Sequence, residues 1–273
     1  MFGKLLKHEI VDTWKIFALL DAVALVLGAI VGVVAFGVLH IEDMPTPLVI
    51  LLVLGVVGYI LLLSALSVLT LVYIVVHFYR SMFSAQGYLT FTLPATATQI
   101  FSAKLLSAFI FELINTVCIF LSVVFALWGI VAFGLKENLA EFFEYFDEFK
   151  ETFTELFGLG PLTIVLYVIF ALVSVLTSIL IFYCAMCIGQ LWQKHKVLGS
   201  VVAYFAITIV TRIITTIVQL GTGAFGTSLF DYDLDTATYF NHTMTVNTGI
   251  FVIFAVIMYV VCIYTTNRKL NLD

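Results

Sequence analysis

Long apolar runs alternate with short polar segments along this chain of 273 residues. Six runs are long enough to cross the ~30 Å hydrocarbon core of a bilayer as helices, since each helical residue rises ~1.5 Å. They span residues 16–39, 48–78, 105–134, 161–191, 198–220 and 248–266. Lipid offers no partner to free backbone groups, and the runs lack strand-like alternation, so they predict helices. We expect a single-domain, all-α integral membrane protein with six transmembrane helices over residues 1–273.

The composition agrees with that of an integral membrane protein. Hydrophobic residues make up 63% of the chain and charged residues 11%, whereas soluble domains carry roughly 25% charged residues. The first apolar run has 24 residues, which exceeds the roughly 7–15-residue apolar core of a cleaved signal peptide. We therefore expect this run to remain in the membrane.

Lysine and arginine are distributed unevenly around the six runs. Only Lys136 and Lys150 fall on one side of the predicted membrane, and nine fall on the side that holds both chain ends. The nine are Lys4, Lys7, Lys15, Arg80, Lys104, Lys194, Lys196, Arg268 and Lys269. Because positively charged loops stay in the cytoplasm, we predict that both termini are cytoplasmic.

Three segments outside the runs have a distinct pattern. Residues 1–15 place apolar side chains at helical spacing, which predicts an amphipathic helix on the inner membrane surface, although a plain charged leader is the alternative. Residues 137–157 place phenylalanines on one face and glutamates on the other, which predicts an acidic amphipathic helix outside the cell. Either this helix packs its phenylalanines on the spans or it recognises a cationic molecule. Residues 221–247 are expected to form a second outer loop.

The segment 79–104 is the longest one on the predicted cytoplasmic side. Its apolar side chains are too numerous for a solvated loop, and exposed apolar clusters usually mark docking sites. Gly87 permits a sharp turn, and Pro94 disfavours helix just before it, so we expect a short helix, a turn and a new helix after Pro94. The alternative is that these residues pack under the protein's own spans.

Three charged residues lie within or near apolar runs, and a charge at the bilayer centre normally faces a partner or a wet cavity. Asp21 lies near the inner surface and is expected to reach it. Arg212 lies deeper, towards the outer half, where its side chain can extend outward. A pair between Glu112 and Arg212 is conceivable, but their depths differ by about 12 Å.

Motifs for chemistry within this chain are missing. There is no G-x-x-x-x-G-K-[ST] phosphate loop, no H-E-x-x-H and no G-x-S-x-G, and the five histidines are scattered. Cys184 and Cys187 form a C-x-x-C, but they lie in an apolar run without a nearby histidine, which favours packing over redox or metal chemistry. We therefore predict no catalytic residues, no metal site and no nucleic-acid partner for this chain.

The loop after the second run carries a resemblance to a known family. FYRSMF at residues 78–83, GYLTFTLP at 87–94 and KLL at 104–106 resemble the first cytoplasmic loop of the membrane subunits of bacterial ABC exporters. The match is closest to the type-2 permeases common in Gram-positive bacteria, whose short leader and six-span layout are also similar. One departure is that the larger outer helix here lies between spans three and four rather than between five and six.

The resemblance implies a division of labour. The loop would contain a coupling helix that fits a groove in a separate cytoplasmic ATPase, with Met82, Phe83, Tyr88 and Leu89 as apolar anchors. The whole coupling set would be Arg80, Met82, Phe83, Gln86, Gly87, Tyr88, Leu89, Thr90, Leu93 and Pro94. Two ATPases would bind ATP and magnesium, and a second permease subunit, identical or related, would complete the exporter in the bacterial plasma membrane. This chain itself would bind no cofactor and would contact membrane lipid.

The resulting prediction is a transmembrane subunit that forms the translocation pathway for an amphipathic substrate such as a peptide, lipid or drug. Few polar groups in the spans favour such a substrate. The alternative is a membrane scaffold or sensor that does not transport and that binds cationic peptides through residues 137–157.

Overall fold

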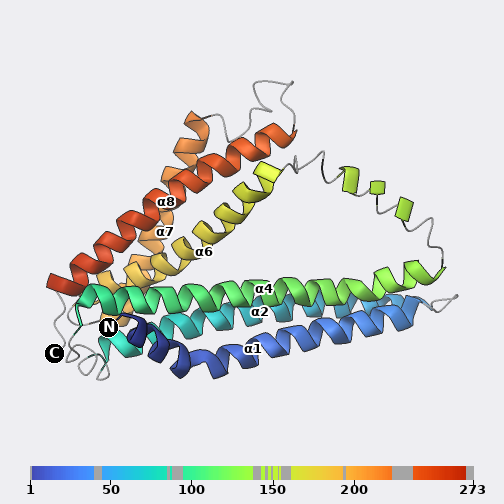
Figure 1. The fold of residues 1–273 in the computed structure, drawn as a ribbon, viewed down its shortest axis with the longest axis horizontal. Helices are drawn as coiled ribbons and strands as arrows, with labels where there is room; N and C mark the ends of the chain where they lie inside the picture. Colours follow the sequence, from blue (N-terminus) through green and yellow to red (C-terminus); the bar gives the residue numbers. More distant parts are fainter. Residues whose placement is uncertain are drawn as a thin grey trace. The chain divides into compact units, whose positions relative to one another are not determined.

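The structure is a computed structural model that describes residues 2–39, 45–84, 87, 95–137, 143–144, 147–148, 150–152, 154, 161–192, 195–222 and 236–268. Six long helices follow one another in these ranges (Figure 1). They are α1 (Phe2–Leu39), α2 (Thr46–Phe83), α4 (Ala97–Glu137), α6 (Pro161–Gly189), α7 (Lys196–Gly221) and α8 (Thr236–Arg268). No strand occurs in this described part of the chain.

Each of the six helices is long and apolar enough to cross a membrane. Within the most apolar stretch of each helix, only 6% to 28% of the residues are buried inside the chain. Such exposure of valine, leucine and isoleucine is unfavourable in water but suits contact with lipid tails. The predicted all-α membrane protein with six spans is thus confirmed, whereas the orientation of the termini stays a prediction.

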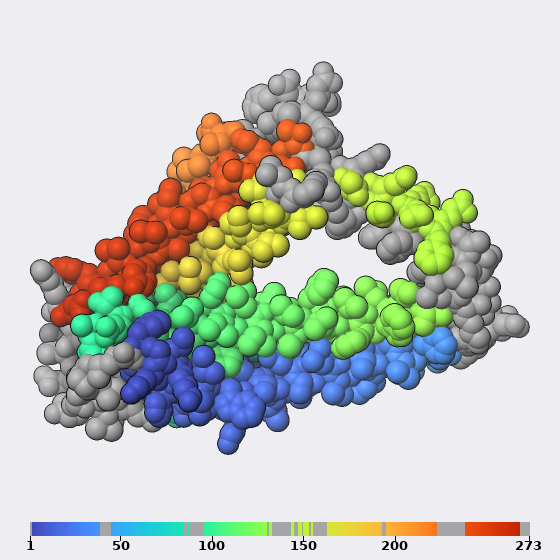
Figure 2. Space-filling view, viewed as in Figure 1, coloured from blue at the N-terminus to red at the C-terminus, as the bar shows by residue number. Residues whose placement is uncertain are grey.

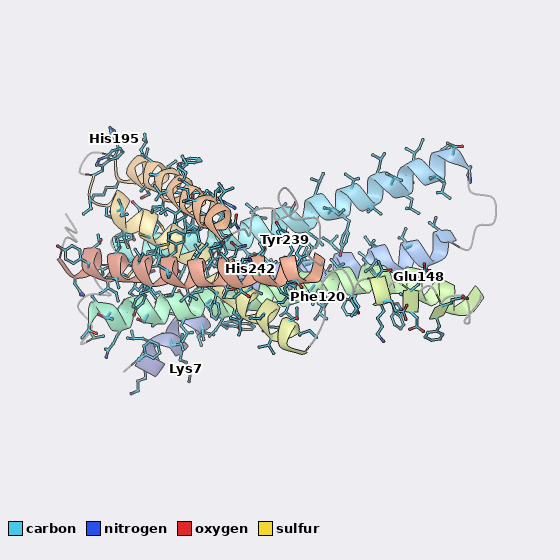
Figure 3. All side chains as sticks on the ribbon, turned by 90° about the horizontal axis from the view of Figure 1, so that it is seen from above. Lys7, Phe120, Glu148, His195, Tyr239 and His242 are labelled. Carbon is cyan, nitrogen blue, oxygen red and sulfur yellow. The ribbon has the colours of Figure 1, made fainter. Side chains whose placement is uncertain are left out.

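Five of the six helices are longer than the apolar runs that predicted them, α1 and α8 by the most, and one predicted element is not separate. The leader 1–15 continues into the first span as one helix from Phe2, so a distinct surface helix is not seen. Helix α8 begins at Thr236, whereas the apolar run begins at residue 248, so part of the predicted outer loop 221–247 is helical. Tyr239 and His242 project from these added turns (Figure 3).

The predicted acidic helix 137–157 lies only partly within the described residues. Those described between 143 and 154 are helical and exposed. They include Phe143, which is 51% exposed. The packing of the phenylalanine face on the spans stays a prediction.

The chain divides into two compact units. Unit 1 comprises Met1–Leu6, Val75–Phe109 and Phe149–Asp273. It therefore contains α6, α7 and α8 together with the end of α2 and the start of α4. Unit 2 comprises Lys7–Ile74 and Ile110–Glu148, which are the greater parts of α1, α2 and α4.

Close backbone contact joins α1 to α4 in unit 2. Gly28 and Gly32 form a G-x-x-x-G pattern on α1, and a side chain at either position would collide with the backbone of Ser122 or Phe125 on α4. A side chain at Gly129 would collide with the backbone of Gly32. Small residues let helices approach closely in lipid, where packing rather than the hydrophobic effect drives association. Figure 2 shows the surfaces of α1 and α4 in contact.

Helix α4 begins with a reciprocal cap after the predicted break at Pro94. The backbone N–H of Gln99 donates to Thr96 Oγ1 at 3.3 Å, and the N–H of Thr96 donates to Gln99 Oε1 at 3.4 Å. This capping box satisfies two of the backbone donors that a helix start leaves open. The expectation that a helix restarts after Pro94 is confirmed.

Candidate functional site

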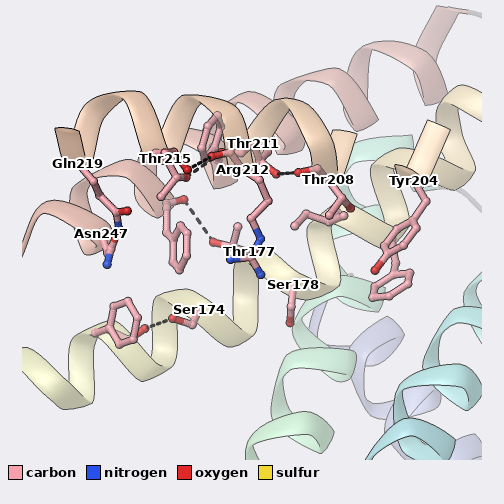
Figure 4. A pocket seen from close by; sticks show the side chains of 16 residues that line it. Ser174, Thr177, Ser178, Tyr204, Thr208, Thr211, Arg212, Thr215, Gln219 and Asn247 are labelled. Carbon is pink, nitrogen blue, oxygen red and sulfur yellow. Dashed lines mark hydrogen bonds between the residues drawn. The ribbon is translucent and has the colours of Figure 1, made fainter. Parts of the chain in front are cut away.

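A polar pocket lies between α6, α7 and α8 in unit 1 (Figure 4). Its volume is about 590 Å³, within the range of roughly 300–1,000 Å³ that is usual for small-molecule sites. The lining residues are Phe170, Ser174, Thr177, Ser178, Ile181, Phe182, Tyr204, Thr208, Thr211, Arg212, Thr215, Thr216, Gln219, Asn247, Phe251 and Phe254. A concentration of hydroxyl and amide groups inside apolar spans is unusual, which makes this pocket the main candidate site.

Most of the pocket's hydroxyl groups are satisfied by their own helices. Ser174 Oγ donates to the carbonyl of Phe170 at 2.6 Å, and Thr215 Oγ1 donates to the carbonyl of Thr211 at 2.8 Å. Such bonds to the preceding turn let serine and threonine lie in a helix within lipid without an unpaired donor. Each oxygen keeps acceptor capacity for a ligand, and its hydrogen can rotate to a better partner.

The pocket contains one charged side chain, Arg212 of α7. It reaches from α7 towards Thr177 and Ser178 of α6 (Figure 4). The structure shows no hydrogen bond or ion pair for this guanidinium among the described residues. Nearby, Thr208 Oγ1 is buried and has no hydrogen-bond partner in the same set of residues. Figure 4 shows the Arg212 side chain directed at the neighbouring helix. Its extension towards the outer membrane surface stays a prediction.

Polar and aromatic contacts hold the walls of the pocket together. Gln219 Nε2 on α7 donates to Asn247 Oδ1 on α8 at 2.7 Å, and Thr177 Oγ1 on α6 lies 3.3 Å from the carbonyl oxygen of Phe251 on α8. The ring of Phe251 stacks on Phe170 with centroids 5.9 Å apart. The pocket therefore combines polar and aromatic lining groups on a connected frame.

An aromatic cluster in unit 1 joins both ends of the predicted coupling loop to the helices of the pocket. Phe78, at the end of α2, stacks on Tyr183 of α6 with ring centroids 3.7 Å apart. Phe101, near the start of α4, contacts the edge of Tyr183 and lies 5.8 Å from the ring of Tyr259 on α8. Phe78 and Phe101 have no solvent exposure. The residues that precede and follow the loop are thus fixed to α6 and α8.

The structure describes only some of the predicted coupling residues. Arg80 is exposed, Phe83 is half-buried, and Met82 is fully buried. A Cβ atom on Gly87 would collide with the backbone of Met82, so the close approach of the chain there needs glycine. The burial of Met82 within its own chain leaves it no free surface for a partner. Gln86, Tyr88, Leu89, Thr90, Leu93 and Pro94 lie outside the described residues, and the docking role of the loop stays a prediction.

The other two intramembrane charges belong to unit 2. The Asn115 amide donates to Asp21 Oδ1 at 2.9 Å and to Thr70 Oγ1 at 3.2 Å, which joins α1, α2 and α4. Asp21 is only 6% exposed, and the amide contact holds its carboxylate between helices. Its position relative to the inner membrane surface stays a prediction. Glu112 Oε2 is buried without a hydrogen-bond partner among the described residues. The Glu112–Arg212 pair stays a prediction.

The C-x-x-C motif lies in the interior of unit 1. Cys184 and Cys187 of α6 are 3% and 0% exposed, and both lie within hydrogen-bonding reach of Cys262 on α8. All three thiols are free. Within the described part of the chain, no group of three or more histidine, cysteine, aspartate or glutamate residues is arranged to hold a metal ion. These cysteines contribute to the packing of α6 against α8.

Comparison with known proteins adds no relative to this picture. No protein-family model, no curated protein and no solved structure matches the chain.

Proposed function

We propose that this chain is the transmembrane subunit of an ABC exporter, which forms the translocation pathway and moves an amphipathic substrate with energy from a separate cytoplasmic ATPase. The proposal starts from the sequence of the loop 79–104. The structural observation that supports it is the aromatic cluster, because this cluster connects the ends of that loop to the helices that line the polar pocket.

A displacement of the loop would be passed on through stacked rings. Phe78 and Tyr183 lie nearly parallel, at 13°, with both side chains buried. Packed interiors have little free volume, so such contacts transmit movement instead of absorbing it. Tyr183 lies in the same helix as Ser174 and Thr177 of the pocket, and Tyr259 lies in the same helix as Asn247 and Phe251. Closure of an ATPase dimer against the loop would therefore shift α6 and α8 as rigid elements.

The cap on α4 supports the same mechanism. Because the side chains of Thr96 and Gln99 accept hydrogen bonds from each other's backbone N–H groups, the helix starts firmly at Ala97, three residues after Pro94. Ser102 Oγ then lies 2.8 Å from the hydroxyl of Tyr259 on α8. The return segment of the loop is thus connected to α8 as directly as the outgoing segment is connected to α6. In this arrangement two ATPases would supply the ATP and magnesium chemistry, and a second permease subunit would complete the pathway.

The test is to isolate the full chain from its native membranes in a mild detergent. Mass spectrometry of the intact complex should find two permease subunits and two ATPase subunits, and the complex should hydrolyse ATP. Tyr88→Asp should abolish both association and hydrolysis, because a charge would replace an apolar anchor at the predicted centre of the loop. Tyr232→Asp is the matched control, since Tyr232 lies in the acidic sequence DYDLD on the predicted outer side.

Two results would reject the proposal. One is a complex without any nucleotide-hydrolysing subunit, which would favour the scaffold or sensor alternative. The other is equal association and hydrolysis in the Tyr88→Asp and Tyr232→Asp variants.

A further inference from the structure

We propose that the pocket between α6, α7 and α8 binds the anionic headgroup of an amphiphile, with Arg212 holding the charge and the phenylalanines of the lining contacting the start of the apolar tail. The identification of this amphiphile as transported cargo rests on the proposed function. The binding itself does not, because it concerns this chain alone.

The charge of Arg212 needs an anion that its own surroundings do not contain. Helices α6, α7 and α8 have no aspartate or glutamate in their sequences. Arginine is costly within a bilayer unless it is paired or hydrated. Arg212 lies 16 residues into α7, or roughly 24 Å from the start of that helix, so it is well inside the span. A phosphate or carboxylate bound in the pocket would supply the missing countercharge in bidentate geometry.

The groups around Arg212 suit an anion. Thr208 Oγ1 has an unused hydrogen, and it lies one helical turn before Arg212 on the same helix. Ser178 Oγ donates to the carbonyl of Val175 at 2.8 Å, and its hydrogen can turn to a stronger, charged acceptor. With no acidic group in the lining, nothing in the pocket repels a negative headgroup. A cation would meet Arg212 directly, so the pocket selects against it.

Apolar side chains in the same lining suit a tail. Phe170, Phe251 and Phe254 contribute rings to the lining, and Ile181 adds an aliphatic side chain. Arg212 is exposed, which shows that the pocket opens on the surface of the three helices instead of being sealed. Its volume of about 590 Å³ holds a headgroup and a short length of chain, and the remainder would extend into the lipid. A pocket that offers one positive charge together with apolar side chains suits an anionic amphiphile.

The experiment measures ligand binding by the purified full chain in an uncharged maltoside detergent. Dodecyl phosphate is the probe, and dodecyltrimethylammonium has the same tail with the opposite charge. We expect the chain to bind the first at least about tenfold more tightly than the second. Arg212→Gln should weaken dodecyl phosphate binding about tenfold or more, since a charge-assisted hydrogen-bond pair is lost. Arg212→Lys keeps the positive charge but not the two parallel N–H donors of the guanidinium, so it should show a smaller loss of affinity.

Arg268→Gln is the matched control, because it removes another arginine that does not line the pocket and should leave the affinity unchanged. Two competitors identify the source of the anion. Displacement by phosphatidylglycerol would assign a bilayer lipid, whereas displacement by inorganic phosphate alone would assign a free anion and would overturn the role of the tail. A correctly folded Arg212→Lys variant keeps the test valid if Arg212→Gln does not fold.

Equal affinity for the anionic and cationic probes would overturn the inference, as would unchanged binding in Arg212→Gln. Tighter binding in Glu112→Gln would also overturn it, because it would show that this carboxylate already neutralises Arg212. The measurement needs no ATPase, so failure here leaves the exporter proposal standing. Conversely, an exporter test that finds no ATPase leaves the binding result intact.

Discussion

Replacement of Gly28 by alanine tests how tightly α1 and α4 pack in unit 2. The added Cβ would lie 2.5 Å from Ser122 Oγ and 2.8 Å from the Ser122 carbonyl carbon, and closer still to the carbonyl oxygen. Ordinary contacts begin near 3.4 Å, so the helices must separate by about 1 Å. Ser122 Oγ now donates to the carbonyl of Ala24 at 2.6 Å. A separation of that size would break this hydrogen bond.

The magnitude follows from three contributions. Overpacking costs about 1–3 kcal/mol, and a hydrogen bond lost within a membrane bundle costs about 0.6–1.7 kcal/mol. Alanine improves helix stability over glycine by about 1 kcal/mol. The net expectation is a loss of about 1–3 kcal/mol of stability in Gly28→Ala. Because about 1 kcal/mol corresponds to roughly 2–4 °C in a chain of comparable size, the midpoint should fall by several degrees.

The assay is thermal unfolding in detergent, followed by the loss of the monodisperse peak in size-exclusion chromatography. Gly37→Ala is the matched control, because Gly37 lies on the same helix and an added Cβ there meets nothing within 4 Å. It should melt at or slightly above the temperature of the unchanged protein. Equal midpoints for Gly28→Ala and Gly37→Ala would refute the close approach of the two helices.

Two further predictions concern the polar network and the aromatic cluster. Asn115→Leu should lower stability by about 1–3 kcal/mol in the same melting assay, because it leaves the Asp21 carboxylate without the amide donor. Adding Asp21→Asn to this variant should restore part of the lost stability. If the double variant restores none of it, the polar network is contradicted. Tyr183→Leu removes the ring that stacks on Phe78. In the proposed exporter, the ATPase should still associate with this variant, but its rate of ATP hydrolysis should no longer change when the pocket ligand is added. A normal change in rate would show that coupling takes another route.

The six spans were predictable because length and hydropathy alone decide which segments lipid accepts. The ends of the helices were less predictable, since a helix can continue beyond the apolar run that crosses the membrane. Helix α8 begins 12 residues before the run that predicted it, and its added turns contain Asn247, which pairs with Gln219 on α7. Polar residues that satisfy each other between helices reduce local hydropathy without ending the helix.

The candidate site was visible in the sequence only through Arg212. Its companions on α7 lie at Thr208, Thr211, Thr215 and Gln219, which recur at steps of three and four and form a polar stripe on an apolar helix. The matching residues on α6 and α8 are scattered in the sequence, so only the fold brings them to the same pocket. The sequence also contains the G-x-x-x-G pattern at Gly28. It does not indicate that α4 is the helix that packs against this pattern.

Helices α6 and α8 each contribute residues to both the aromatic cluster and the pocket. Tyr183 and Tyr259 belong to the cluster, and other residues of the same two helices line the pocket. On α8, Asn247 and Tyr259 are separated by 12 residues, or about 18 Å of continuous helix. If the proposed ATPase and pocket ligand both bind this chain, thermodynamic linkage makes their effects mutual. Whatever factor the bound ATPase applies to ligand affinity, the bound ligand applies to ATPase affinity. In the proposed exporter, a ligand that the ATPase-bound state binds more tightly would thus strengthen assembly with the ATPase, and its loss would weaken that assembly.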